Sequence, residues 1–281
     1  MTSDSTVKPI VKPAVGPAAT PTGRIGLRTD GMVRWLIFDQ PAKHNALSMG
    51  MIEDAFDAVR AFSEDGNQRV LVLTGGGDRA FVSGGDLAEF ERGRDADEAE
   101  RRYLALAGDL FEAVADCPKP TIAAIHGYCF GGGVALAAAC DLRYAADDAQ
   151  FCIPSARLGL AFPLTFVRWM VDLIGPAPTR EMLYTGRRYD SAEADGFGLV
   201  NRVYPKAALE AEVARIAGTV ADNAPMSVRA AKETIGYLLG EPAEAGRIAC
   251  EEAVAACANS RDFAEGRAAF AEKRKPVFEG R

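Results

Sequence analysis

Two glycine-rich segments contain the residues whose types and spacing could do chemistry. They are FVSGGDL at 81–87 and HGYCFGGG at 126–133. Each follows a short apolar run and precedes a helical pattern, which predicts a turn from a buried strand into a helix. Glycine lets a backbone approach a ligand closely, and the first amides of a helix are unpaired donors with partial positive charge. Two such turns side by side would offer two N–H groups to one oxygen, which is an oxyanion hole.

Two other interpretations of these glycines stay open at this point. A glycine-rich turn can cradle a phosphate, but the chain has no GxxxxGK[ST] sequence and no GxGxxG that opens a first βαβ unit. The glycines could also serve only to let elements pack tightly. The residues alone therefore favour an oxyanion hole over a nucleotide site without deciding between the hole and packing.

The elements that must position these turns alternate between strand and helix. Residues 24–28 and 32–38 flank Asp30-Gly31 and predict a hairpin, and Ser48 is expected to cap a helix. Buried strands are expected at 70–74 and from 121, a charged helix up to about 117, and short strands at 142–146 and 150–153. The later helices are expected at 206–222, 226–239, 243–258 and 261–273. This order indicates an α/β core followed by a helical C-terminal region.

Residues 121–140 contain no Asp, Glu, Lys or Arg and are about long enough to span a bilayer. Gly127 and the triple glycine at 131–133 interrupt the segment, because glycine at this density breaks a continuous helix. We therefore expect a strand, a turn and a short helix deep in the core, and no membrane span.

Composition excludes several classes of function. The chain has 281 residues, a formal charge of −7 and 48% hydrophobic residues, so nucleic acid is not the expected partner. Two histidines and six cysteines without a CxxC pair leave little material for a metal site, and we expect none. Free thiols fit a reducing, cytoplasmic location. Residues 1–23, with prolines at 9, 13, 17 and 21, predict a disordered tail rather than a signal peptide.

Further short motifs accompany the two turns in a fixed order. They are PAKHNAL (41–47), CDL (140–142), AQF (149–151), TG (185–186), ADGFGLV (194–200) and FAEKRKPVF (270–278). With these motifs the chain, from about residue 24 to its end, resembles the enoyl-CoA hydratase/isomerase (crotonase) superfamily. The resemblance implies an α/β fold, a crotonase-like spiral of ββα units at 24–205 that holds the ligand site. It also implies a helical trimerisation region at 206–281, a homotrimer or dimer of trimers, and an acyl-coenzyme A thioester as ligand.

The resemblance also assigns roles to individual residues. The two oxyanion amides fall on Gly85 and Gly132. Coenzyme A, which is part of the substrate rather than a separate cofactor, is expected at the following residues: Lys43, Ser83, Asp86, Leu87, and Lys273 and Phe278 of a neighbouring subunit. Two structural alternatives to coenzyme A binding remain. Asp86 could cap a helix, and the basic C-terminus could be an ordinary solvated surface.

The chain differs from the family at the sequence positions of the catalytic acids and bases. The positions at which the family's hydratases carry two glutamates hold Ala135 and Ser155, and a position used for aspartate in other members holds Pro163. A serine hydroxyl is no general base near neutral pH without a partner, so Ser155 is expected to orient a ligand or be inert. Six residues are candidates to replace the missing acids and bases, although none of them lies at a characteristic spacing. They are Glu89, Cys129, Cys152, Arg157, Arg168 and Tyr184. His126 is expected to be structural, and His44 to lie near the coenzyme's edge or be exposed.

Three hypotheses follow for the reaction. The first is a reaction that needs enolate stabilisation but little proton transfer, such as decarboxylation of a malonyl-type thioester, with Arg157 or Arg168 holding the carboxylate. The second is hydration or double-bond isomerisation with an unidentified acid or base, expected to be slow because such groups contribute about 10²–10⁴-fold. The third is an inactive acyl-CoA-binding or assembly protein.

Overall fold

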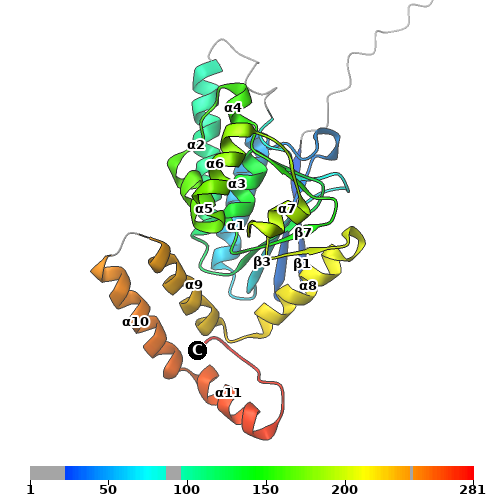
Figure 1. Ribbon diagram of the computed structural model, residues 1–281. Coiled ribbons are helices and arrows are strands. Elements are labelled where there is room, and N and C mark those ends of the chain that lie inside the picture. Colours follow the sequence, from blue (N-terminus) through cyan, green and yellow to red (C-terminus); the bar gives the residue numbers. More distant parts are fainter. Residues whose placement is uncertain (1–22, 87–95, 241–242) are drawn as a thin grey trace, which may run out of the picture.

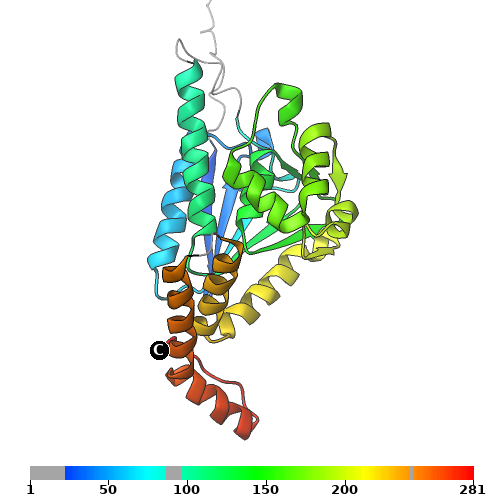
Figure 2. The same cartoon turned by 60° about the vertical axis from the view of Figure 1, so that its left-hand side comes forward.

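The computed structural model describes residues 23–86, 96–240 and 243–281. The predicted tail, apart from Gly23, and the candidates Leu87 and Glu89 lie outside the described residues. Figures 1 and 2 show an α/β body from which the last helices extend.

A six-stranded sheet in the order β1-β2-β3-β5-β7-β10 forms the base of the body. The hairpin β1 (Arg24–Asp30) and β2 (Val33–Asp39) is antiparallel, as Asp30-Gly31 predicted. The other strands run parallel: β3 (Val70–Gly75), β5 (Thr121–Ile125), β7 (Leu142–Ala146) and β10 (Arg202–Tyr204). Strands β3 and β5 are almost continuously buried, because helices cover both faces of this part of the sheet.

A second, four-stranded sheet has the order β4-β6-β8-β9. Its strands are β4 (Ala80–Val82), β6 (Tyr128–Phe130), β8 (Gln150–Cys152) and the antiparallel β9 (Tyr189–Asp190). Three strands of the first sheet, β3, β5 and β7, each lead into a short strand of the second sheet and then into a helix. The units β3–β4–α2 (Ala96–Ala115), β5–β6–α3 (Gly132–Ala139) and β7–β8–α4 (Ser155–Leu158) are the turns of the expected ββα spiral.

Two apolar layers fix this arrangement. On one face of the large sheet lie α1 (Met49–Glu64), α2 and α3, and every residue of α3 from Gly133 to Ala139 is buried. On the other face lies α8 (Lys206–Asp222), whose Leu209 and Val213 pack against Trp35 of β2. Ser48 caps α1 by accepting a hydrogen bond from the Met51 amide at 3.2 Å, as predicted.

The remaining helices surround the core or leave it. The short 3-10 helix η1 (Pro41–Lys43) precedes α1, while α5 (Leu164–Ile174), α6 (Pro176–Thr185) and α7 (Ser191–Gly196) flank α3 and α4. Helices α9 (Pro225–Leu239), α10 (Glu244–Ala258) and α11 (Arg261–Glu272) extend away from both sheets (Figure 1). The predicted α/β core with C-terminal helices is therefore confirmed.

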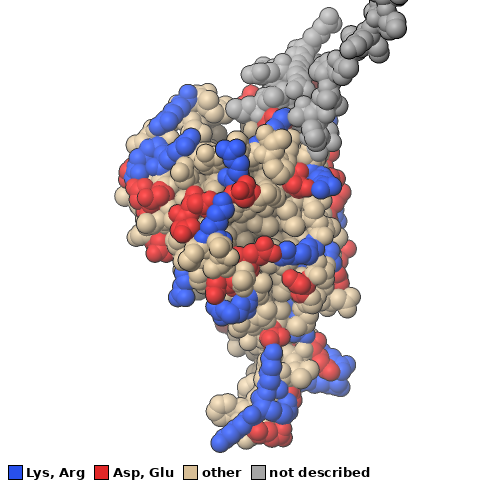
Figure 3. All heavy atoms as spheres, turned by 90° about the vertical axis from the view of Figure 1, so that its right-hand side faces the viewer, with Lys and Arg blue, Asp and Glu red and all other residues tan. Residues whose placement is uncertain are grey.

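The surface mixes charges of both signs. On the face shown in Figure 3, Lys and Arg side chains lie among Asp and Glu side chains rather than in one basic patch. All six cysteines are free thiols, and four of them are buried. No helix within the described ranges is long and apolar enough to cross a membrane.

Candidate active site

The two glycine-rich turns meet in the folded chain. A Cβ atom built on Gly84 would lie 4.0 Å from the amide nitrogen of Gly132, and one built on Gly132 would lie 3.9 Å from the Cα of Gly84. Gly84 has a φ of +106°, which side-chain-bearing residues rarely adopt. A Cβ on Gly133 would lie 2.1 Å from the carbonyl oxygen of Val82, so the start of α3 approaches β4 too closely for any side chain.

The amides of Gly85 and Gly132 remain available at this junction. Within the described residues neither amide donates a hydrogen bond, whereas the neighbouring amides of Asp86 and Gly131 bond to the carbonyl oxygens of Leu47 and Cys152 at 2.9 and 2.8 Å. Gly132 is the first residue of α3, where no intrahelical partner exists and the helix dipole is positive. The turns thus present two unused N–H groups near each other, as an oxyanion hole requires.

The segment before α1 supports the first turn. Leu47 donates from its amide to the carbonyl oxygen of Gly84 at 2.8 Å and pairs with Gly85 as an isolated bridge. Asn45 is fully buried with a φ of +57°, and its side-chain amide donates to the carbonyl oxygens of Gly76 and Ala80 at 2.9 and 2.7 Å. These contacts show the structural role of the PAKHNAL motif, because its Asn45 and Leu47 fix the backbone next to Gly85.

Several predicted coenzyme A residues gather beside this turn. Lys43 forms an ion pair with the buried carboxylate of Asp86. The Ser83 hydroxyl donates to the carbonyl oxygen of Lys43 at 3.2 Å, and the Ser83 amide donates to that of His44 at 3.2 Å. The structure therefore brings Lys43, Ser83 and Asp86 together next to Gly85. The interpretation of Asp86 as a helix cap concerns residues 87–95, which lie outside the described residues.

The positions for acids and bases carry no carboxylate. Ala135 is buried inside α3, and Pro163 precedes the first residue of α5. Ser155 begins α4 with only 6% of its surface exposed, and its hydroxyl makes no hydrogen bond to another described residue. A serine hydroxyl can bond to a ligand but cannot take a proton as a strong base would.

Tyr103 of α2 lies at the first turn, which the sequence did not indicate. A Cβ built on Gly85 would lie 2.8 Å from the Tyr103 hydroxyl, and one built on Gly132 would lie 3.7 Å from the ring of Phe111, also on α2. Tyr103 is 7% exposed. A phenol can both donate and accept a hydrogen bond, so the two turns are accompanied by one ionisable hydroxyl and an aromatic wall. No sequence motif marks it, because only the packing of α2 on the turn places it there.

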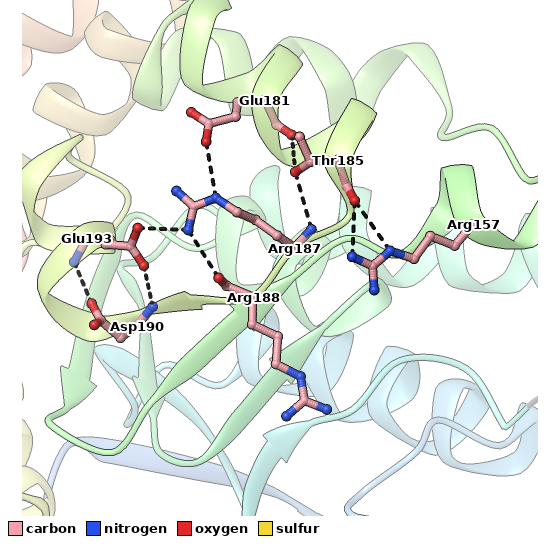
Figure 4. A network of polar contacts seen from close by, with 7 residues as sticks. All are labelled: Arg157, Glu181, Thr185, Arg187, Arg188, Asp190 and Glu193. Atoms are coloured by element: carbon pink, nitrogen blue, oxygen red, sulfur yellow. Dashed lines mark hydrogen bonds and ion pairs between the residues drawn. The ribbon is translucent and has the colours of Figure 1, made fainter.

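Arg157, Arg187 and Arg188 lie close together around α6 and β9 (Figure 4). Arg187 bonds to the carboxylates of Glu181 and Glu193 at 3.1 and 2.7 Å, and these bonds raise the pKa of the guanidinium. Arg157 donates only to the carbonyl oxygen of Thr185, at 3.2 and 3.3 Å. Arg157, two residues after Ser155, thus has no carboxylate partner among the described residues.

The other replacement candidates that lie within the described residues are unsuited to proton transfer. Burial raises the pKa of the Cys129 and Cys152 thiols, which keeps both protonated. Arg168 donates to the carbonyl oxygen of Leu239 and pairs with Asp172, and Tyr184 is 73% exposed. His126 lines a separate pocket against Lys206 and Leu209 of α8, where burial and then the charge of Lys206 lower its pKa.

Comparison with known proteins identifies the family. The family model for enoyl-CoA hydratase/isomerase matches residues 29–281. The chain belongs to the enoyl-CoA hydratase/isomerase family. A carnitinyl-CoA dehydratase of Citrobacter koseri is 36% identical over 257 residues, which cover 89% of this chain and 96% of the relative. A crotonyl-CoA hydratase of Syntrophomonas wolfei is 34% identical over 243 residues, covering 86% and 93%.

A solved structure of an enoyl-CoA hydratase of Bacillus anthracis superimposes with a TM-score of 0.87 at 32% identity, covering 92% of this chain and all of that one. This agreement confirms the expected enoyl-CoA hydratase/isomerase fold.

Lys273 and Phe278 are placed away from the glycine turns of their own chain. Both follow α11, which lies at the opposite end of the molecule from α4 (Figures 1 and 2). Phe278 packs near Gly266 of α11, and its carbonyl oxygen accepts a hydrogen bond from Arg69. A role for either residue at the coenzyme therefore requires a second copy of this family member, as the sequence-based expectation stated.

Proposed function

We propose that this chain is an enzyme that binds an acyl-CoA thioester and stabilises its enolate at the amides of Gly85 and Gly132. The observation that carries the proposal is the meeting of the two turns, at which neither amide donates to a described residue. The thioester oxygen gains negative charge as the enolate forms, and two preorganised donors beside the positive end of α3 stabilise that charge. The names of two relatives, a carnitinyl-CoA dehydratase and a crotonyl-CoA hydratase, support a CoA thioester as the ligand.

The proton chemistry differs from that of a hydratase with two glutamates. With Ala135 and Ser155 at the expected positions, we infer that ordinary hydration is slow or absent. We propose that the Tyr103 hydroxyl, which lies beside Gly85, donates a hydrogen bond or a proton to the bound substrate. Ser155 is suited to orient a substrate group or a water molecule, since its hydroxyl makes no hydrogen bond to a described residue.

Decarboxylation of a malonyl-type thioester is the second candidate, favoured by Arg157. Its guanidinium faces no carboxylate among the described residues and could hold that of the substrate. The bond between the α-carbon and the carboxylate breaks, carbon dioxide leaves, and the electron pair forms the enolate that the two amides stabilise. A proton then adds to the α-carbon. No side-chain base is needed for the first step, which agrees with the missing carboxylates.

A substrate panel tests these proposals. Turnover is measured with crotonyl-CoA, a 3-enoyl-CoA and methylmalonyl-CoA, together with acyl-CoA binding by calorimetry. Activity on methylmalonyl-CoA alone is the result expected for decarboxylation, and slow activity on the first two supports hydration or isomerisation. Saturable binding without any turnover would show an inactive binding protein. The double variant Ala135→Glu, Ser155→Glu should gain hydratase activity if the missing carboxylates alone prevent it.

We also propose that the chain assembles into a homotrimer or a dimer of trimers. Leu158, Leu160 and Leu164 are exposed around α4 and α5, and a second apolar set is exposed on the C-terminal helices and tail. The second set is Ile235, Leu238, Leu239, Ile248, Val254, Phe263, Phe270 and Val277. Helices α4 and α11 lie at opposite ends of the molecule (Figures 1 and 2), so the apolar residues of these two regions can cover each other only between copies. Such head-to-tail contacts form a ring when the rotation between copies closes. Light scattering should report a multimer that Phe270→Glu disrupts and the control Leu27→Glu does not.

A further inference from the structure

A pocket of about 420 Å³ lies at the joint between the body and the C-terminal helices, separate from the glycine turns. The end of α1, the start of β3, the turn before β5, the connection from α8 to α9 and the C-terminal segment all contribute to its wall. Nothing in the proposed acyl-CoA chemistry uses this joint pocket. Some charged side chains of its lining form no ion pair with another described residue.

Two cations of the joint pocket have no acidic partner. Arg69 donates to the carbonyl oxygens of Ala221 and Phe278 at 2.9 and 2.7 Å, and Lys119 donates to those of Phe62 and Asp65 at 2.8 and 2.7 Å. No carboxylate lies within ion-pair distance of either group among the described residues. A guanidinium has five N–H donors and an ammonium three, so Arg69 retains three and Lys119 one. Burial lowers the pKa of Lys119, and the charges of Cys117 and Asp65 oppose this shift only in part.

The N-terminus of α9 opens into the same pocket. Pro225 is its first residue, no side chain caps it, and its first turn has no acidic residue. Val228 donates to the carbonyl oxygen of Ala224, whereas the amides of Met226 and Ser227 donate to no other described residue. Free amides and the positive end of a 15-residue helix attract an anion.

A buried side chain in the wall also lacks a partner. Gln68 is 6% exposed, and its side-chain nitrogen donates to the carbonyl oxygen of Gly31 at 3.2 Å. Its side-chain oxygen makes no hydrogen bond, which is costly for a buried acceptor. A ligand hydroxyl would satisfy this oxygen.

The remaining charged residues of the wall are already paired. Arg229 bonds to Glu233 at 2.7 Å, and Glu279 bonds to Arg281 at 2.6 Å. The Asp65 carboxylate faces Arg34 at 3.5 Å, and the charge of Lys119 contributes only the last of the causes that lower its pKa. The pocket therefore keeps two cations that form no ion pair with a described residue, in a chain whose formal charge is −7.

We propose that the joint pocket binds an anion with one or two phosphate groups, or a small phosphate ester with a hydroxyl group. The phosphate oxygens accept bonds from Arg69, Lys119 and the first amides of α9, and Gln68 accepts one from a hydroxyl. Because Arg69 also contacts Ala221 at the end of α8 and Phe278 in the C-terminal segment, the bound anion stabilises the docking of the C-terminal helices on the body.

Calorimetric titration with inorganic pyrophosphate, at constant ionic strength, tests the site in the full chain. We expect saturable 1:1 binding that Lys119→Met weakens at least about tenfold, or about 1.4 kcal/mol. The control Arg180→Met removes an exposed charge from α6 and should bind like the wild type. Because Lys119→Met and Arg69→Met each also remove two contacts to backbone carbonyl oxygens, thermal unfolding establishes that a variant keeps the fold before its binding is measured.

A second measurement follows the backbone directly. Hydrogen exchange at residues 226–227 should slow when pyrophosphate is added, and should not slow when chloride replaces it. Pyrophosphate that does not bind, or that binds equally to Lys119→Met, would overturn the proposal. Binding that saturating coenzyme A competes away would also overturn it, because the anion would then occupy the acyl-CoA site. Failure here leaves the acyl-CoA function unaffected, since the Gly85 and Gly132 turns do not line this pocket.

Discussion

Replacing Gly132 with proline removes one of the two proposed oxyanion donors. Gly132 is the first residue of α3, where the amide has no intrahelical partner and proline is well tolerated. A Cβ at this position would meet nothing closer than 3.7 Å, the distance to the ring of Phe111. Gly132→Ala is therefore a matched control that adds the Cβ and keeps the N–H group.

The expected loss follows from the chemistry of the hole. Removal of one donor from an oxyanion hole raises the barrier by about 3–4 kcal/mol, and 1.36 kcal/mol corresponds to a factor of ten in rate. Gly132→Pro should therefore lower kcat about 10²–10³-fold relative to Gly132→Ala. The KM should rise as well, because the proline Cδ takes the place of the amide hydrogen that points into the hole, so the ratio of kcat values carries the prediction.

The measurement is steady-state turnover of whichever panel substrate the wild type converts. Circular dichroism and thermal unfolding establish that both variants keep the fold. A folded Gly132→Pro enzyme with a kcat within about threefold of Gly132→Ala would refute the assignment, since this difference is under about 0.7 kcal/mol. If both variants lost the same activity, the Cβ rather than the N–H group would be responsible.

Three further predictions concern Tyr103, Asn45 and His126. Tyr103→Phe should lower kcat with little change in stability, because it removes the hydroxyl beside Gly85 and keeps the buried ring; equal kcat in steady-state turnover contradicts the proposed contact. Asn45→Ala should reduce the free energy of unfolding by about 3 kcal/mol, because two buried hydrogen bonds and one partly buried hydrogen bond lose a partner; urea denaturation measures this, and a loss under about 1 kcal/mol contradicts it. Burial lowers the pKa of His126, so the unfolded chain binds its proton first and stability falls as pH drops from about 6.5 towards the lowered pKa. Urea denaturation from pH 7.5 to 5 should show a smaller fall in His126→Gln, and identical slopes contradict this assignment.

Elements with long periodic patterns could be predicted from the sequence. The hairpin at Asp30-Gly31, the buried strand beginning at Thr121 and the helices after residue 205 appear close to their predicted bounds. Residues 121–140 form a strand, a turn and a short helix as expected, with β6 added between them. The local signals sufficed here because turn residues and apolar periodicity agree with the final packing.

Shorter elements and their contacts were not predicted. Strands β4 and β6 have three residues each, and β9 has two, which is too few for a periodic pattern. The helices α4 to α7 were also missed, because α4 and α7 are short and Gly175 and Gly186 interrupt the segment. The meeting of Gly84 with Gly132 depends on pairing between strands far apart in the sequence. The family resemblance implied that meeting, but neither Tyr103 nor the joint pocket had a motif to mark it.

The central claim is that the amides of Gly85 and Gly132 bind the thioester oxygen. Infrared difference spectroscopy of a bound acyl-CoA, labelled with ¹³C at the thioester carbonyl, tests it directly. Two hydrogen bonds should polarise the carbonyl and shift its stretching band to lower frequency than in water, and Gly132→Pro should reverse much of the shift. A carbonyl band at its aqueous frequency in the wild-type complex, or an unchanged shift in Gly132→Pro, would contradict the claim.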